Sequence, residues 1–240
     1  MTEQLFLADA YRKSAPGVVQ RVTEEGGVVL DATIFYAQGG GQPGDSGALD
    51  WEDGRMRVAT SVKGENGEII LVPEDASPLP PVGAKVDQRL DWERRYALMR
   101  MHTVLHLLSV VIPLPVTGGA IGAEKGRLDF DMPEAPEDKA VLQGRLNALI
   151  DRDLPVSESW ITDAELEANP GLVKTMSAMP PKGAGRVRLI RIGAEGTGQV
   201  DLQPCGGTHV RSTGEIGKAT LGKIEKKGRQ NRRVSVMLDG

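Results

Sequence analysis

The three histidines and the single cysteine of this 240-residue chain fall into two pairs with the same spacing. The pairs are His102-x3-His106 and Cys205-x3-His209. Residues four apart on a helix share one face, so His102 and His106 can present two imidazoles to one point. The segment Cys205-Gly-Gly-Thr-His209 puts a thiolate and an imidazole on a tight glycine turn. No histidine or cysteine is left outside these pairs.

Together the four side chains offer three nitrogens and one sulfur, a borderline-soft set that suits tetrahedral zinc. The pairs lie about a hundred residues apart, so only the tertiary fold can bring them together. Core histidines with a buried thiol are one alternative, and a purely structural zinc is another. Structural zinc sites usually use short knuckles with several thiolates. This set is rich in histidine, which favours a catalytic metal.

A catalytic zinc lowers the pKa of its bound water to about 7 and polarises a carbonyl, so ester or amide hydrolysis is expected. No Ser-His-Asp set remains, because every histidine is assigned to the metal. The glycine-rich segment Gly39–Gly44 lacks the Gly-Lys-Ser/Thr ending of a P-loop. The sequence therefore predicts neither an ATP site nor synthetase activity.

Positive charge is concentrated in one segment of an acidic chain. The net charge is −4, but Lys218–Arg233 holds seven basic residues and one acidic residue, which leaves −10 for the remainder. Such a stripe on an acidic body predicts a restricted contact with nucleic-acid phosphates. Lys226, Lys227 and Arg229 are its candidate binding residues. A solvated strand or turn is the alternative.

The predicted secondary structure that must position these residues changes near residue 90, from strands alone to helices and strands. Before it, short alternating apolar segments predict strands, including a hairpin over residues 18–35 around Gly26-Gly27. After it, Asp91 can cap a helix that ends near Val111. The remaining predictions are a helix over Glu137–Asp153 and strands over Val187–Ile192, Ala219–Ile224 and Arg233–Leu238.

The fold class predicted is α+β, in two domains. Residues 1–90 form a small N-terminal β-barrel domain with the glycine-rich loop, and residues 91–240 form a two-layer α/β domain with a mostly antiparallel sheet around the zinc. No apolar run reaches the ~18 residues that span a membrane, and the N-terminus has no apolar signal core. We expect a soluble, cytoplasmic protein.

Four segments resemble the AlaX family, free-standing relatives of the editing domain of alanyl-tRNA synthetase. That domain is also similar to the N-terminal editing domain of threonyl-tRNA synthetase. A glycine-rich part ahead of the editing domain resembles the medium-length form of the family. The segments are FYAQGGGQPGDSG from Phe35, RRYALMRMHTVLHLL from Arg94, RLDFDM from Arg127 and CGGTHVRSTGEIG from Cys205.

The resemblance implies hydrolysis of Ser-tRNA, and in some members Gly-tRNA, mischarged on alanine tRNA, with a barrel like those of translation factors ahead of the editing domain. By position, the four residues of the two pairs match the metal ligands. Thr103 matches the threonine thought to bind the seryl hydroxyl, a contact that would reward serine where size cannot exclude alanine. Val104 stands where alanine is common, which should alter packing and not ligation.

Two glycine segments are candidate substrate sites. The backbone N–H groups of Gly39, Gly40 and Gly41 can approach the aminoacyl end or the terminal ribose. Gln38 and Gln42 can hydrogen-bond the adenosine end. Gly206 and Gly207 either donate N–H groups to a developing oxyanion or only allow the turn.

Arg127, Asp129 and Asp131 alternate with apolar residues as in a strand, and a structural role is as plausible as a substrate contact. Two other functions also stay open. One is a non-catalytic tRNA-binding module with a structural zinc, which would leave no open position for water. The other is threonyl-type editing of Ser-tRNA, which differs in the tRNA it accepts.

Overall fold

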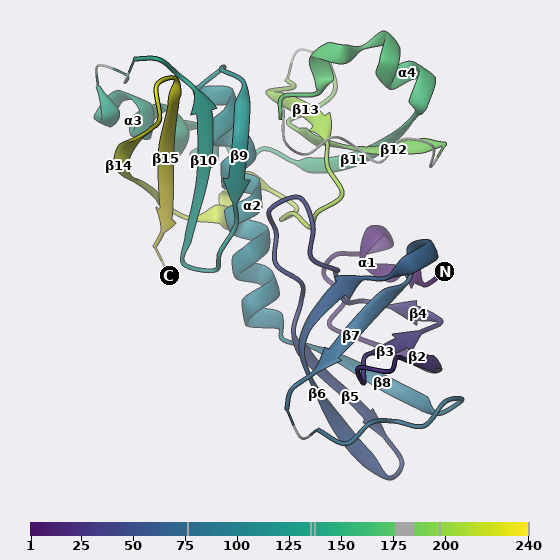
Figure 1. Cartoon of the computed structure of the whole chain (residues 1–240). Coiled ribbons are helices and arrows are strands. Elements are labelled where there is room, and N and C mark those ends of the chain that lie inside the picture. Colours follow the sequence, from purple (N-terminus) through teal and green to yellow (C-terminus); the bar gives the residue numbers. More distant parts are fainter. Residues whose placement is uncertain (76, 135, 137, 176–184, 197, 240) are drawn as a thin grey trace. The chain divides into compact units, whose positions relative to one another are not determined.

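Six antiparallel strands of the N-terminal part close into a barrel in the order β2-β3-β7-β6-β5-β8 (Figure 1). Their bounds are Ser14–Val22 (β2), Val28–Leu30 (β3), Gly47–Trp51 (β5), Gly54–Lys63 (β6), Ile69–Pro73 (β7) and Lys85–Leu90 (β8). Two further short strands, β1 (Glu3–Gln4) and β4 (Ala32–Thr33), pair in parallel, and the short helix α1 (Leu5–Ala8) follows β1. The structure describes residues 1–75, 77–134, 136, 138–175, 185–196 and 198–239.

The alternation of buried and exposed residues that predicted strands is clear in β8, where Val86, Gln88 and Leu90 are buried. Gln88 is the buried polar residue of this strand. Its Oε1 accepts from the Thr33 hydroxyl at 2.7 Å and from the Ile34 N–H at 3.1 Å. The amide therefore satisfies backbone and side-chain groups that would otherwise be buried without partners.

The hairpin predicted over residues 18–35 is confirmed for β2 and β3, but its second strand is interrupted. Strand β3 ends at Leu30, and β4 begins at Ala32. The Asp31 carboxylate accepts from the N–H groups of Val18 and Ala32, both at 2.8 Å. Because this side chain competes with strand pairing, the chain turns at Asp31.

The remainder of the chain contains two antiparallel sheets. The division into compact units, Met1–Tyr96 and Ala97–Gly240, falls within helix α2 (Trp92–Val111). One sheet has the order β14-β15-β10-β9, with β9 at Val116–Ala120, β10 at Lys125–Asp131, β14 at Ala219–Lys227 and β15 at Asn231–Leu238. The other has the order β11-β12-β13, with β11 at Val156–Thr162, β12 at Arg186–Ile192 and β13 at Asp201–Pro204.

Helix α2 crosses one face of the four-stranded sheet (Figure 1). A Cβ added to Gly126 of β10 would lie 2.5 Å from the Met101 sulfur, so a larger residue would force the Met101 side chain to move. Leu98, Met99 and Leu107 of α2 are almost completely buried. The part of α2 that carries the first histidine pair therefore packs within the second unit.

Helix α3 (Lys139–Asp151) packs beside β14. Its N-cap is Asp138, whose carboxylate accepts from the Ala140 N–H at 2.7 Å. The Asn147 side chain exchanges two hydrogen bonds, of 2.8 and 2.9 Å, with the backbone of Ala219. The helix was predicted to begin at Glu137, a residue outside those that the structure describes.

The short helix α4 (Asp163–Ala168) follows β11, and 3-10 turns η1 (Glu65–Gly67), η2 (Pro170–Leu172) and η3 (Thr213–Ile216) complete the elements. The predicted fold class, a barrel followed by an α/β part with antiparallel strands, is confirmed. Among the described residues, no helix is both long and apolar enough to cross a bilayer.

Candidate metal centre

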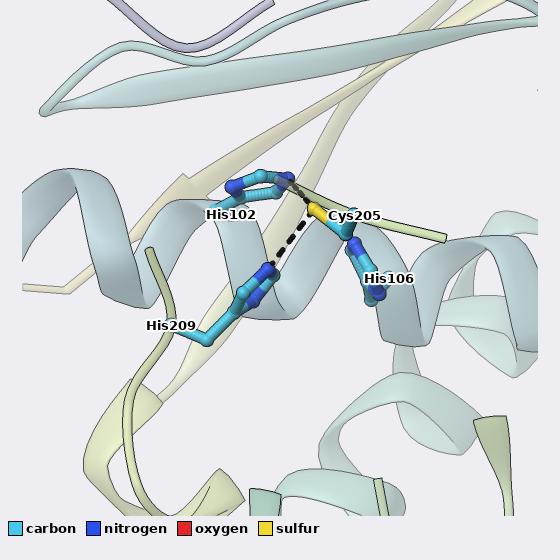
Figure 2. A group of neighbouring side chains, drawn as sticks. All are labelled: His102, His106, Cys205 and His209. Carbon is cyan, nitrogen blue, oxygen red and sulfur yellow. Dashed lines mark hydrogen bonds between the residues drawn. The ribbon is translucent and has the colours of Figure 1, made fainter. Parts of the chain in front are cut away.

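Helix α2 carries His102 and His106 one turn apart on its buried side. Each residue is only 7% exposed, and their ring centroids lie 5.2 Å apart. Figure 2 shows the two imidazoles leaving the same face of the helix toward the Cys205 sulfur. The four-residue spacing has the consequence expected from helix geometry.

Cys205 and His209 come from the loop between β13 and η3. The Cys205 Sγ lies 3.4 Å from Nε2 of His102 and 3.3 Å from Nε2 of His209 (Figure 2). The His209 ring centroid lies 4.2 Å from that of His102 and 4.6 Å from that of His106, so the three rings form a compact triangle. The fold therefore joins the two pairs into one cluster.

The donor set and its spacing fit a tetrahedral metal ion. With Zn–S bonds of about 2.3 Å and Zn–N bonds of about 2.0–2.1 Å, tetrahedral angles put sulfur and nitrogen ligands about 3.6 Å apart. The observed separations of 3.3 and 3.4 Å are close to this value. One ligand atom from each of the four residues lies within 4.8 Å of all the others. The cluster could thus hold a metal ion, and its chemistry suits zinc among several divalent metals.

The protonation states of the sulfur and one nitrogen already favour a cation. Burial by itself would raise the pKa of the Cys205 thiol, but the adjacent His102 and His209 hold it well below its ordinary value. Burial, with the like charge of His102, lowers the pKa of His209 well below 6.5. A thiolate and a neutral imidazole are the forms that bind metal.

His106 has a buried carboxylate on its other nitrogen. Its Nδ1 lies 3.1 Å from Oδ2 of Asp201, which also accepts from Gln203 Nε2 at 2.8 Å. Lys174 Nζ lies 2.5 Å from the second oxygen. Burial lowers the pKa of His106, but hydrogen bonds with Asp201 and Cys205 outweigh this effect and raise it to about 9. Because Nδ1 faces Asp201, Nε2 is the nitrogen left for a metal.

Thr103 lies between the two histidines of α2 and contacts a third. Its hydroxyl donates to the Met99 carbonyl at 2.9 Å and lies 3.1 Å from Nδ1 of His209. It also accepts from the Val210 N–H at 3.3 Å. The residue is completely buried.

The cysteine loop is held by an arginine that the sequence alone did not indicate. Arg188 of β12 donates through Nη1 to the carbonyls of Cys205 at 3.1 Å and Gly207 at 2.8 Å. The Gly207 N–H points back to the Cys205 sulfur at 3.4 Å, whereas Gly206 is exposed. In the sequence, the only signal for Arg188, Asp201 and Gln203 is that they are polar residues alternating with apolar ones in strands near the cysteine. Many surface strands share this pattern, so it does not reveal the roles of these residues.

The glycine-rich loop lies in the first unit and ends in a tight turn. Gly39 and Gln42 exchange backbone hydrogen bonds of 3.0 and 2.9 Å across Gly40 and Gly41. The φ values of these two central glycines are 57° and 82°, which fits a type I′ turn. Gln38, Gly40 and Gly41 are exposed, whereas Gln42 is 1% exposed.

The predicted basic residues lie at the end of the β14–β15 hairpin in the second unit. Lys226 pairs with Arg232 across the hairpin, and Lys227 pairs with Asn231. Lys226, Lys227 and Arg229 are all exposed. These three basic side chains therefore face solvent at the end of the hairpin.

Further along the same sheet, Arg127 and Arg233 share Asp129. Arg233 donates to both carboxylate oxygens, at 2.7 and 2.8 Å, and Arg127 Nη1 donates to one at 2.8 Å. The two arginines line a cavity of about 330 Å³ together with Lys125 and Glu225. Of the polar residues of RLDFDM, Arg127 thus lines a basic recess, and Asp129 pairs with both of its arginines.

Comparison with known proteins relates the chain to parts of tRNA synthetases and to tRNA editing proteins. Residues 187–235 match the family described as the second additional domain of threonyl- and alanyl-tRNA synthetases, and residues 8–94 match that of class II (A) tRNA synthetases. Two relatives are alanyl-tRNA editing proteins AlaX-M. That of Methanosarcina acetivorans is 35% identical and that of Saccharolobus solfataricus 37%, each over 98% of both chains.

The same region is found within a longer protein. The chain is 39% identical to an alanine–tRNA ligase of Pyrobaculum arsenaticum over 94% of its own length. It spans only 25% of that ligase. The similarity to the ligase therefore covers one part of a larger molecule.

Proposed function

Because the chain belongs to the AlaX-M family of alanyl-tRNA editing proteins, we propose that it hydrolyses the ester bond of mischarged alanine tRNA with the help of zinc. The substrate proposed is Ser-tRNA, with Gly-tRNA as a second one. The observation that carries the proposal is the convergence of His102, His106, Cys205 and His209 on one point. These residues stand in the two segments with the family's metal-site pattern.

Zinc, when bound, supplies a Lewis acid and a water of lowered pKa, which is the chemistry that an ester bond requires. The chain's own residues prepare the site for it. Cys205 contributes the negative charge, and His209 is held in the neutral form. The buried Asp201 fixes the ring orientation of His106.

The cysteine loop gives its two glycines different roles. The Gly207 N–H donates to the Cys205 sulfur at 3.4 Å, which supports a role in holding the thiolate. Gly206 is exposed, and a Cβ there would meet open space. We assign the Gly206 N–H to the developing oxyanion of the ester, where a preorganised donor stabilises the transition state.

Two exposed segments are the proposed tRNA contacts. At the glycine turn, Gln38, Gly40 and Gly41 are exposed, and we assign the Gln38 side chain and the two glycine N–H groups to the terminal adenosine. Gln42 is buried, which supports a role in shaping this turn. At the β14–β15 hairpin, Lys226, Lys227 and Arg229 present positive charge to backbone phosphates.

The deciding experiment is a deacylation assay with zinc-loaded protein on alanine tRNA charged with serine, glycine or alanine. We expect rapid loss of serine, slower loss of glycine and little loss of alanine. Chelation should abolish the activity, and zinc should restore it. Binding of tRNA without hydrolysis of any ester would instead favour the non-catalytic module with a structural zinc.

Threonyl-type editing remains the second candidate, because the matched family covers domains of both threonyl- and alanyl-tRNA synthetases. Threonine tRNA charged with serine tests it directly in the same assay. Faster hydrolysis on threonine tRNA than on alanine tRNA would reverse the assignment of the tRNA.

A further inference from the structure

We propose that Thr103 is a positioning residue for the metal centre. Its hydroxyl holds the ring of His209 and does not bind the seryl side chain. The part of this inference that concerns serine rests on the proposed editing function. The part that concerns the metal depends only on the geometry of the cluster.

The hydrogen-bonding capacity of the Thr103 hydroxyl is fully used inside the protein. A hydroxyl has one donor and two acceptor positions. Its proton goes to the Met99 carbonyl at 2.9 Å, and one acceptor position takes the Val210 N–H at 3.3 Å. His209 Nδ1, at 3.1 Å, occupies the other when the ring carries its proton on Nδ1. Nothing remains for a substrate hydroxyl.

The direction of the bond to His209 follows from the other side of its ring. His209 Nε2 lies 3.3 Å from the Cys205 sulfur and points into the cluster (Figure 2). A neutral imidazole that binds metal through Nε2 carries its proton on Nδ1. The Nδ1–H group then donates to Thr103, whose own proton is already directed to Met99.

Burial and rotamer restriction support the same role. Thr103 is completely buried, so a seryl side chain would have to displace a neighbour to reach it. The bond to the carbonyl four residues earlier fixes the side-chain rotamer, as is common for helical threonines. The hydroxyl is therefore held in a single orientation beside the His209 ring and the Val210 N–H.

In each of two candidate ligands, His106 and His209, the Nδ1 atom therefore has a side-chain partner. Asp201 supports His106 with a carboxylate, and Thr103 supports His209 with a neutral hydroxyl. Such outer partners set the tautomer and ring orientation of a metal-bound histidine, and their removal typically weakens metal binding 10- to 100-fold. The residue that recognises the seryl hydroxyl is then a different one.

The test compares Thr103→Val, which removes the hydroxyl, with Thr103→Ser, which keeps it. Zinc affinity is measured by competition with a chromophoric chelator, and cobalt-loaded protein reports the ligand geometry through its d–d and thiolate charge-transfer bands. We expect Thr103→Val to weaken zinc binding about 10- to 100-fold and to alter the cobalt spectrum. Thr103→Ser should stay close to wild type. Unchanged zinc affinity and spectrum in folded Thr103→Val would overturn the proposal.

Two further measurements complete the test. In zinc-loaded wild-type protein, long-range proton–nitrogen NMR should show the His209 proton on Nδ1; a proton on Nε2 would contradict the assignment, even if Thr103→Val fails to fold. For Ser- and Gly-tRNA, Thr103→Val should lower both deacylation rates and leave their ratio within about twofold. A selective loss of serine hydrolysis with intact zinc binding would make Thr103 the serine-binding residue. If wild-type protein hydrolyses neither ester, the editing proposal fails while the metal measurements still decide the role of Thr103.

Discussion

Asp201 holds a carboxylate oxygen 3.1 Å from Nδ1 of His106, although the two residues are 95 positions apart in the chain. The carboxylate is buried and is bonded by Lys174 and Gln203 as well. Burying a charge costs free energy unless the charge is paired and hydrogen-bonded, so an ordinary apolar core would not contain this carboxylate. Its position indicates that the fold preserves the orientation of one imidazole.

We expect Asp201→Asn to weaken zinc binding about 10- to 100-fold, because the amide keeps the shape but removes the charge that orients and polarises His106. Chelator competition measures the affinity. Asp151→Asn, at an exposed position at the end of α3, is the matched control and should bind zinc like wild type. Equal affinities for the two variants would remove Asp201 from the metal centre.

The cluster should bind one zinc ion per chain. Elemental analysis after expression with zinc and removal of free metal should find about one equivalent, because four ligand atoms converge at a single place. Cys205→Ala should lose most of this metal while the barrel core stays folded, since that core shares no residues with the cluster. Less than a tenth of an equivalent in wild type would refute the metal centre.

Reversing the charge of Lys226, Lys227 and Arg229 together should weaken binding to any tRNA, since phosphate contacts carry no sequence information. Each lost contact should flatten the salt dependence of log K by roughly 0.7 to 0.9. Filter binding between low and high salt measures both effects. Reversal of Lys226 and Lys227 can be matched with reversal of Arg145 and Arg152, two exposed arginines of the same unit. The hairpin is ordinary surface if the two double variants bind equally well.

Arg95→Met should destabilise the barrel unit by about 3–5 kcal/mol, because it leaves the buried Asp45 carboxylate without its charged partner. Both side chains are essentially unexposed, and Arg95 also donates to the carbonyls of Ala10 and Ile34. Urea unfolding gives the free energy. Arg57→Met breaks an exposed pair with Glu74, at 3.8 Å, and should cost less than about 1 kcal/mol. Similar losses in both variants would contradict the expected effect of burial.

The stability contributed by Asp129 should depend on pH. Hydrogen bonds from Arg233, and then from Arg127, outweigh burial and lower the pKa of its carboxyl below 3.8 in the folded protein. A lowered pKa contributes stability above the unfolded value of about 4, and this contribution is lost as the pH falls toward the folded value. Wild type should therefore exceed Asp129→Asn in unfolding free energy at pH 7, and the difference should shrink as the pH falls below the unfolded pKa of about 4. A difference that is constant with pH would show that charge is not its origin.

The sequence by itself predicted the four residues that meet in the candidate metal cluster, and much of the secondary structure. Residue type and spacing identified His102, His106, Cys205 and His209, because soft donors in matched pairs have few other uses. The helix capped by Asp91 was predictable from local signals, since α2 begins at Trp92 and ends at Val111. Alternation likewise predicted β12 almost to its ends. These are short-range effects that neighbouring residues encode.

Only the tertiary structure decided what surrounds the ligands. Asp201, Gln203 and Arg188 are ordinary strand residues in the sequence, and their roles arise from side chains that lie far away in the chain. The arrangement of antiparallel strands into two sheets was also beyond prediction, because strand pairing depends on long-range contacts. For Thr103, the sequence showed only that a hydroxyl group follows the candidate ligand His102. The direction of that hydroxyl, toward His209 and Met99, depends on which groups the fold buries beside it.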